Sequence, residues 1–327
     1  MMGVGQLIDK LFGGSAVQNE AVLCAYGKLP FYAEYRRLEV SPGTPTAYSQ
    51  WLDEGRLAWV RSSMKSDNSS TRSSRLLIML PGAKEVVVAS VWDSRDNLGR
   101  IFPFSFFITC PPEALGADPV ERWVAAAAVH RAFDRLYSLL HTLASGGNFY
   151  KRFKKHMITL KPTDFIDRVK ALREDAAGIE VEQWFKGLML GDETNPAEWF
   201  GGLLHRVERW KNQDGAGDDM ALGCPLAQGV PFSAQVVVWL DWLENLYAKS
   251  GKSPGLILPM NDEKNAPDLM ILLRDPLPDD YQLLTTDARA YGYVEHLAAI
   301  PESNCDAAPS AEPPTGSLAT WLKKHAP

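Results

Sequence analysis

The chain has 327 residues, of which 46% are hydrophobic and 23% are charged, and its formal net charge is −6. This is the composition of an ordinary globular protein, and the negative charge argues against nucleic acid as a partner, because binding to phosphates generally uses a basic surface. The apolar stretches are shorter than the roughly 20 residues that cross a bilayer, and residues 1–12 lack the pattern of a secretory signal, so we expect a cytoplasmic protein without a membrane span.

The residue types that carry common chemistry are scattered along the chain. The four cysteines lie far apart without a CxxC pair, so we expect buried reduced thiols rather than a zinc or redox site. The histidines form no ligand cluster, and the chain contains neither a GxSxG nor an HExxH motif. The sequence therefore predicts no catalytic residues, no metal and no cofactor; the cysteines are Cys24, Cys110, Cys224 and Cys305.

The first predicted elements belong to an α/β region that we expect to span residues 21–160. Residues 1–20 mix glycines with polar groups and predict a flexible lead-in. The apolar run Val22–Tyr26 predicts a strand, and Pro30 places a turn after it because proline lacks a backbone donor. The segment Ser62–Ser74 has the serine-rich composition of a solvated loop.

Three runs rich in β-branched and aromatic residues follow. The four residues that separate the first two runs have hairpin length, which predicts an antiparallel meander. The runs are apolar at nearly every position, which is typical of a sheet covered on both faces. They are Leu76–Leu80, Glu85–Trp92 and Ile101–Cys110.

A long helix should cover this meander. Asp118 is a favoured N-cap residue, and Pro119 is favoured at the first helical position. Apolar residues then recur at spacings of three and four up to Leu140, and Gly146-Gly147 should end the helix.

Residues 161–300 predict a helical region with closing strands of the same or a second lobe. Helices are expected from Thr163, Glu180 and Asn195, then over Ser233–Ser250 and near Asp287–Ala299. The segment 211–231 reads as a loop, and strands are expected at Leu256–Leu258 and Leu269–Leu273. Residues 301–327 predict a proline-rich linker and a short apolar stub. The elements together predict an α+β fold, a mostly antiparallel sheet flanked by helices.

Two segments resemble a known family. The stretch Tyr26–Tyr35, which contains Gly27-Lys28-Leu29-Pro30, resembles the start of the TagF/ImpM family of type VI secretion-associated proteins. The family's Gly-Asp-Phe stands here as Ala33-Glu34-Tyr35. Its Trp-x-x-Trp-Leu pattern stands as Tyr48, Trp51 and Leu52, and Arg37 lies between the two.

The second segment, Asp93–Phe104, is similar to the family's Asp-x-x-Gly-Arg-x-Phe-Pro-Leu element. Asp96 and Gly99 should shape a turn between two strands, and Arg100 presents a fork of five donors beside it. Because this segment and the first one both flank predicted strands, we expect them to come together in space. The resemblance covers about residues 22–145.

The resemblance implies a cytoplasmic accessory protein of the type VI secretion apparatus, without enzymatic activity. In several family members this is a post-translational repressor that acts through a forkhead-associated scaffold protein. The residues assigned to partner binding are Lys28, Glu34, Tyr35, Arg37, Asp96 and Arg100, of which Lys28, Glu34 and Arg100 are expected to be exposed. The residues assigned to the structural motif are Gly27, Leu29, Pro30, Trp51, Gly99, Phe102 and Pro103.

Two other functions stay open at the level of sequence. The chain could be a structural subunit of the secretion assembly, or a hydrolase that uses dispersed carboxylates such as Asp93, Asp96 or Asp218. A further alternative concerns the motif itself: Glu34 and Arg100 could pair with each other and hold the two segments together, instead of meeting a partner.

Overall fold

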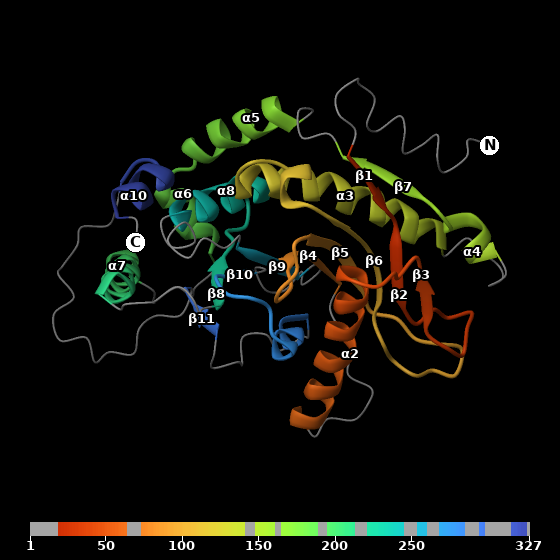
Figure 1. Cartoon of the computed structure of the whole chain (residues 1–327). Coiled ribbons are helices and arrows are strands. Elements are labelled where there is room, and N and C mark those ends of the chain that lie inside the picture. The colour runs from red at the N-terminus through yellow and green to blue at the C-terminus, as the bar shows by residue number, and fades with distance from the viewer. Residues whose placement is uncertain are drawn as a thin grey trace. The chain divides into compact units, whose positions relative to one another are not determined.

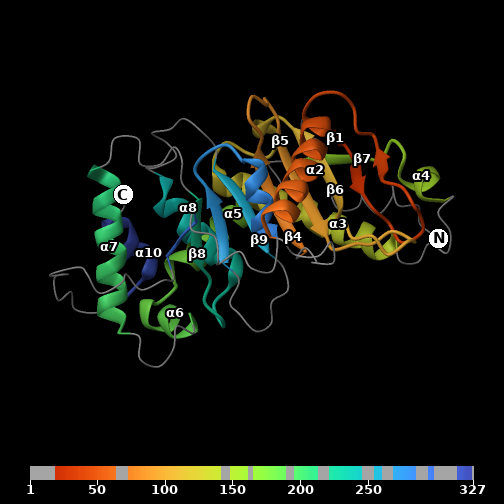
Figure 2. The same ribbon diagram turned by 90° about the horizontal axis from the view of Figure 1, so that it is seen from below.

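The computed structural model describes residues 19–63, 73–140, 148–160, 165–188, 195–212, 221–244, 254–259, 268–284, 294–297 and 315–325. The chain forms two compact units, whose elements are labelled in Figures 1 and 2. Unit 1 is drawn from Met1–Ile166, Gly255–Asn261 and Asp275–Ala288, and unit 2 from the remaining segments. The predicted lead-in, apart from residues 19 and 20, lies outside the described residues, as do residues 64–72 of the predicted serine-rich loop and the linker 301–314.

An antiparallel sheet forms the centre of unit 1, and the predicted α+β class and meander are confirmed. All its neighbouring strands pair antiparallel, with Leu77 opposite Val88 and Val88 opposite Ile108. The strand order is β9 (Gly255–Pro259), β4 (Ser74–Met79), β5 (Val86–Trp92), β6 (Phe104–Cys110), β2 (Cys24–Gly27) and β3 (Arg36–Leu38).

Helices cover both faces of this sheet, because neighbouring strand residues point to opposite sides. The ring of Phe106 lies 6.3 Å from that of Phe133 on α3 (Pro119–Leu140). The next side chain, Phe107, lies 4.7 Å from Tyr48 on α2 (Thr44–Ser63). Apolar residues on both sides of β6 are therefore buried, as the predicted two-sided sheet requires.

The start of α3 is as predicted. The Asp118 carboxylate accepts a hydrogen bond of 2.9 Å from the backbone N–H of Glu121, and Pro119 is the first helical residue. The apolar stripe that includes Val120, Trp123 and Phe133 is buried. The predicted end of the helix at Gly146-Gly147 lies outside the described residues.

The predicted strand Val22–Tyr26 is wrong in its continuity. The chain forms β1 (Asn19–Val22), which pairs with β7 (Met157–Leu160) in a separate two-stranded sheet, and then β2. The change occurs at Leu23, whose N–H donates to the carbonyl of His156 at 2.8 Å. Two different partners thus divide one apolar run.

Unit 2 contains strands that local pattern did not indicate. The predicted loop 211–231 includes β8 (Ala221–Pro225), and the predicted helix 287–299 includes β11 (Val294–His296). The residues of β8 are all buried, because β11 pairs with it in parallel and β10 (Asp268–Leu272) antiparallel. Two long-range neighbours therefore override a sequence rich in Gly, Cys and Pro.

The helices of unit 2 follow the prediction more closely. The Asn195 side chain accepts a 2.9 Å hydrogen bond from the N–H of Ala197, so it caps a helix as expected. The helix predicted over Ser233–Ser250 has described bounds that end at Trp242, and residues 245–250 lie outside the described part. The helices are α5 (Ile166–Ala177), α6 (Val181–Gly187), α7 (Pro196–Asn212), α8 (Phe232–Trp242) and α10 (Leu318–Lys324).

The predicted C-terminal stub is α10, and it docks on unit 2. Leu318 and Leu322 are buried, and the Trp321 ring lies 4.5 Å from that of Phe200 on α7. The N–H of Leu318 donates to the carbonyl of Ile179 at 2.7 Å. Backbone bonds and side-chain packing together hold a helix that would be too short to be stable alone.

Candidate binding surface on two loops

The two motif segments come together, as predicted. Residues 28–35 follow β2 and residues 93–103 connect β5 to β6, and we call these two segments the loop pair. Figure 1 shows them at the same end of the sheet, below β2 and β3. The Ser94 hydroxyl donates to the carbonyl of Lys28 at 2.7 Å, and the N–H of Asn97 donates to the carbonyl of Tyr32 at 3.1 Å.

Gly27 allows this close approach. Its φ is +129°, and a Cβ atom there would lie 2.0 Å from the carbonyl oxygen of Pro103 and 2.8 Å from the Cα of Phe104. A side chain would meet rigid backbone, and the dihedral itself is one that L-residues rarely adopt. The motif glycine is thus required where β2 enters the loop pair.

Asp96 organises the second loop. Its Oδ1 accepts hydrogen bonds from the N–H groups of Leu98 and Arg100, both at 2.9 Å. The N–H of Gly99 donates to the carbonyl of Asp96 at 3.0 Å, and Gly99 has φ +80°. An aspartate that bonds its own following backbone is a common device for closing a turn.

The other carboxylate oxygen of Asp96 carries an ion-pair network. Its Oδ2 lies 2.7 Å from Nε of Arg100 and 3.1 Å from Nζ of Lys28, and the Asp96 side chain is fully shielded from solvent. Burial raises the pKa of Asp96, but the hydrogen bonds from Arg100, Lys28 and Leu98 outweigh it and hold the pKa well below its usual range. Asp96 is therefore a permanent anion that ties both loops together.

The structure changes the reading of two charged motif residues. Lys28 was expected to be exposed, but only 8% of its side chain is, because it reaches Asp96 from the opposite loop. Half of the Arg100 side chain is exposed, and the guanidinium also donates to the carbonyl of Ala33. Within the described residues Arg100 therefore pairs with Asp96, and not with Glu34 as in the alternative reading.

An aromatic cluster packs beneath the first loop. The Tyr35 ring stacks on Tyr26 at 5.8 Å and meets Phe102 edge-on at 4.7 Å. The ammonium of Lys28 lies 5.2 Å from the Tyr35 ring, so the cluster and the ion-pair network share one wall. Phe102 is buried, whereas 40% of Tyr35 is exposed.

Two exposed apolar residues lie beside these groups. Phe31 is 37% exposed and Leu98 is 66% exposed. Each is next in sequence to one end of the hydrogen bond that joins Tyr32 to Asn97, so they lie near each other across the loop pair. The sequence analysis missed both, although an apolar residue inside a polar turn such as Asn97-Leu98-Gly99 is a usable signal.

The remaining motif residues take different places. Arg37 is exposed on β3, with its guanidinium 5.3 Å from the Tyr26 ring. Leu29 is buried and Pro30 is exposed within the first loop. Trp51 belongs to another contact, because its indole N–H donates to the carbonyl of Leu277 at 2.8 Å beside the 3-10 helix η3 (Pro278–Leu284).

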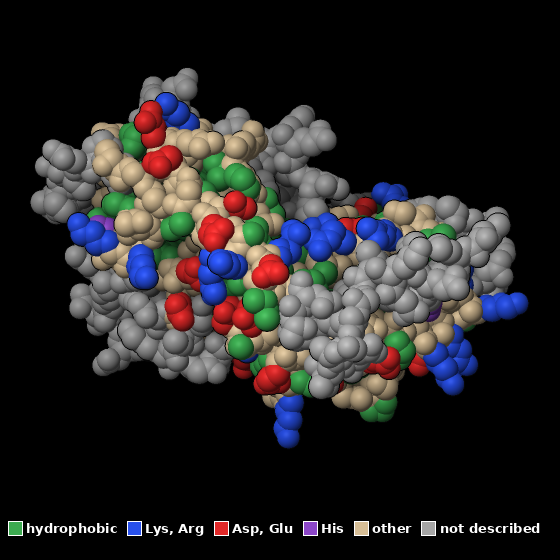
Figure 3. All heavy atoms as spheres, turned by 90° about the horizontal axis from the view of Figure 1, so that it is seen from above, with side chains coloured by type: hydrophobic (Ala, Val, Ile, Leu, Met, Phe, Trp, Pro, Cys, Tyr) green, Lys and Arg blue, Asp and Glu red, His purple; other side chains and the backbone are tan. Residues whose placement is uncertain are grey.

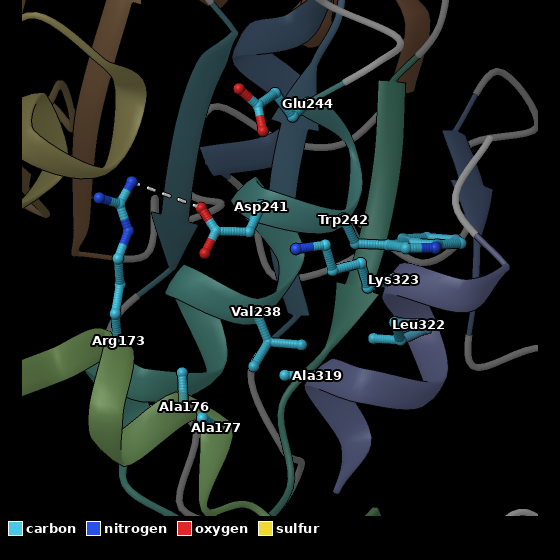
Figure 4. A pocket seen from close by; sticks show the side chains of 10 residues that line it. All are labelled: Arg173, Ala176, Ala177, Val238, Asp241, Trp242, Glu244, Ala319, Leu322 and Lys323. Atoms are coloured by element: carbon cyan, nitrogen blue, oxygen red, sulfur yellow. Dashed lines mark ion pairs between the residues drawn. The ribbon is translucent and has the colours of Figure 1, made fainter.

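A cavity of about 360 Å³ lies elsewhere, in unit 2 between α5, α8 and α10 (Figure 4). Its wall combines apolar side chains such as Val238 and Leu322 with charges of both signs, and Arg173 lies 3.7 Å from Asp241 across it. The predicted site residues do not line this cavity. Among the described residues there is also no group of three or more His, Cys, Asp or Glu side chains that could hold a metal ion.

Comparisons with known proteins add little. No family model and no curated protein matches the chain. The crystal structure of PA0076 from Pseudomonas aeruginosa PAO1 aligns with 20% sequence identity and a TM-score of 0.31, over 40% of this chain and 60% of that chain. A likeness this low supports no conclusion about fold or function. In the described part of the chain, no helix is long and apolar enough to cross a bilayer.

Proposed function

We propose that this chain is a TagF/ImpM-type protein: a cytoplasmic accessory or regulatory factor of the type VI secretion system that acts by binding other proteins. The observation that carries the proposal is the loop pair. Two motif segments about seventy residues apart in sequence form one surface, which a buried ion-pair network fixes and which presents Phe31, Glu34, Tyr35, Leu98 and part of Arg100 to solvent.

A fixed surface of this kind suits protein binding. Ordering a loop during binding opposes association, and here the bonds from Asp96 and Ser94 order both loops beforehand. Aromatic and arginine side chains dominate the energetics of protein interfaces, and an apolar centre with a charged rim is their usual arrangement. Phe31, Tyr35 and Leu98 would form that centre, with Arg100 and Glu34 at the rim.

The resemblance suggests a forkhead-associated scaffold protein as the partner, and repression of secretion as the outcome. A structural subunit of the assembly would use the same surface but would stay with the apparatus in a fixed ratio. A hydrolase using Asp96 has less support. That carboxylate is engaged at both oxygens, and a group whose pKa is held so low is a poor proton carrier near neutral pH. Asp218 lies outside the described residues.

Partner capture from the native host tests the proposal. Leu98→Ser and Phe31→Ser should each reduce the amount of captured secretion-system protein by about tenfold, because each removes an exposed apolar group from the centre of the surface. The melting temperature should stay unchanged, because neither side chain is buried. Mass spectrometry identifies the captured protein and its ratio to the chain.

Leu57→Ser is the matched control, since Leu57 is 49% exposed on α2, away from the loop pair. Glu34→Ala should weaken capture at unchanged melting temperature. Arg100→Ala should lower both, because Asp96 loses a partner. Capture that is equal in Leu98→Ser, Phe31→Ser and the control would refute a binding role for the loop pair.

A further inference from the structure

Basic side chains form a second surface, next to the loop pair, which we call the basic face. It comprises two residues of β3 and four residues in and just after α4 (Asn148–Phe153). Five of the six are exposed, and Arg36 is half-buried. The residues are Arg36, Arg37, Lys151, Arg152, Lys154 and Lys155.

Specific contacts hold the strand and the helix side by side. The Arg36 guanidinium lies 3.4 Å above the ring of Tyr32 and 6.0 Å from the ring of Tyr150, on α4. At the far end of β3, the Glu39 carboxylate accepts a hydrogen bond of 3.3 Å from the N–H of Lys155. The six basic residues therefore belong to one continuous surface of unit 1.

This surface lacks internal neutralisation. Among the described residues, the four basic side chains between Lys151 and Lys155 take part in no ion pair. Cations elsewhere do, and the α4 edge appears in Figure 3 as a gathering of Lys and Arg side chains, whereas acidic and basic side chains mix on the rest of that face. The paired cations include Arg75 with Asp134, Arg173 with Asp241 and Lys186 with Glu182.

The basic face is continuous with the loop pair through Tyr32. The carbonyl of Tyr32 accepts the hydrogen bond from Asn97 in the second loop, and its ring supports Arg36 of the basic face. Tyr35 and Tyr150 are exposed by 40% and 37% on the two sides of this junction. A partner seated on the loop pair would thus reach the basic face without leaving the protein surface.

We propose that the basic face docks an acidic segment of the partner protein whose apolar part the loop pair binds. The inference rests on the proposed function, and charge complementarity selects the occupant. Nucleic acid and membranes present extended arrays of negative charge, which would also meet the rest of a chain whose net charge is −6. A short acidic segment meets only the basic face, because salt screens charges beyond about 10 Å.

Decaglutamate, labelled with a fluorophore and titrated with the full chain, is the probe. Its binding should weaken steeply as salt rises from about 50 to about 200 mM. R152E/K154E should weaken binding by about tenfold, because two attractions become repulsions. The matched control is R168E/K170E, which makes the same change in net charge at two exposed residues of α5.

Several outcomes would overturn the inference. One is no binding of decaglutamate by the parent chain, and another is an equal loss in the two double variants, which would show that only net charge matters. A third is tighter binding of a single-stranded oligonucleotide, or of vesicles with about 30 mol % phosphatidylserine, that R152E/K154E removes.

Leu98→Ser separates this inference from the proposed function. It should bind decaglutamate like the parent chain while capturing less partner from the host. If partner capture is insensitive to Leu98→Ser but the peptide still depends on Arg152 and Lys154, the proposed function fails and the basic face stands. The reverse pattern leaves the proposed function and removes the acidic segment.

Discussion

At the scale of single residues, Asp96 shows how a motif residue can act through other residues. Its carboxylate faces inward, and it receives contacts from Lys28 on one loop and from Leu98 and Arg100 on the other. These contacts set the shape of a surface on which Asp96 itself is hidden. A residue of this kind affects binding by positioning others.

Acid sensitivity should reveal this role. The pKa of Asp96 is lowered from its ordinary value of 3.8 in the folded chain. Its contribution to stability is therefore complete above that ordinary value and is lost as pH falls through the lower folded-state pKa. Asp96→Asn should be less stable than the parent at neutral pH, and the difference between the two should shrink below about pH 4. Urea midpoints measured across this pH range provide the test.

Glu182→Gln is a suitable control for that series. Glu182 also pairs with a lysine at 2.7 Å, but 81% of its side chain is exposed, so its removal should change stability little at any pH. A stability difference between the parent and Asp96→Asn that stayed constant down to about pH 3 would contradict the depressed pKa.

At the scale of elements, α3 illustrates how a local signal fixes the position of a helix. Pro119 has no N–H to leave unsatisfied in the first turn, and the Asp118 carboxylate accepts the N–H of Glu121. The Glu121 carboxylate reaches back to the N–H of Ala117 at 2.6 Å. This start places Phe133 over the sheet, so the cap is coupled to the core of unit 1.

Asp118→Ala should lower the free energy of unfolding of unit 1 by about 1 kcal/mol, because an N–H at the helix start loses its acceptor. Asp118→Ser should restore most of this loss, since a serine hydroxyl can accept the same bond. Guanidinium unfolding, followed by circular dichroism, measures both variants. Equal stability of the alanine and serine variants would mean that the cap contributes nothing.

At the scale of the whole molecule, both units hide their thiols. Cys24 and Cys110 in unit 1 and Cys224 in unit 2 are free and buried, as the sequence predicted. Burial, with help from nearby carboxylates such as Glu85, raises the pKa of Cys24 and of Cys110 to about 12. Very little reactive thiolate therefore exists near neutral pH.

Thiol labelling tests the burial of the three cysteines. In a Cys305→Ser background, which removes the one cysteine outside the described residues, the native chain should react with a thiol reagent only at the rate of unfolding. Three thiols should appear in denaturant. Rapid labelling of the native chain would show that at least one of these thiols is accessible.

The sequence by itself determined the features that depend on neighbours in the chain. The meander followed from β-branched runs separated by a hairpin-length turn, and α3 followed from Asp118, Pro119 and a helical apolar period. The convergence of the two motif segments was also predictable, because both flank strands of one meander.

Only the tertiary structure decided the features that depend on distant partners. The strands β8 and β11 form because each fills a place beside another strand, although their local sequences favour a loop and a helix. Lys28 is buried because a carboxylate from the opposite loop neutralises it. The basic face exists because α4 packs beside β3, more than a hundred residues earlier in the chain. Long-range contacts leave no periodic trace in the sequence, and so they are the part that required coordinates.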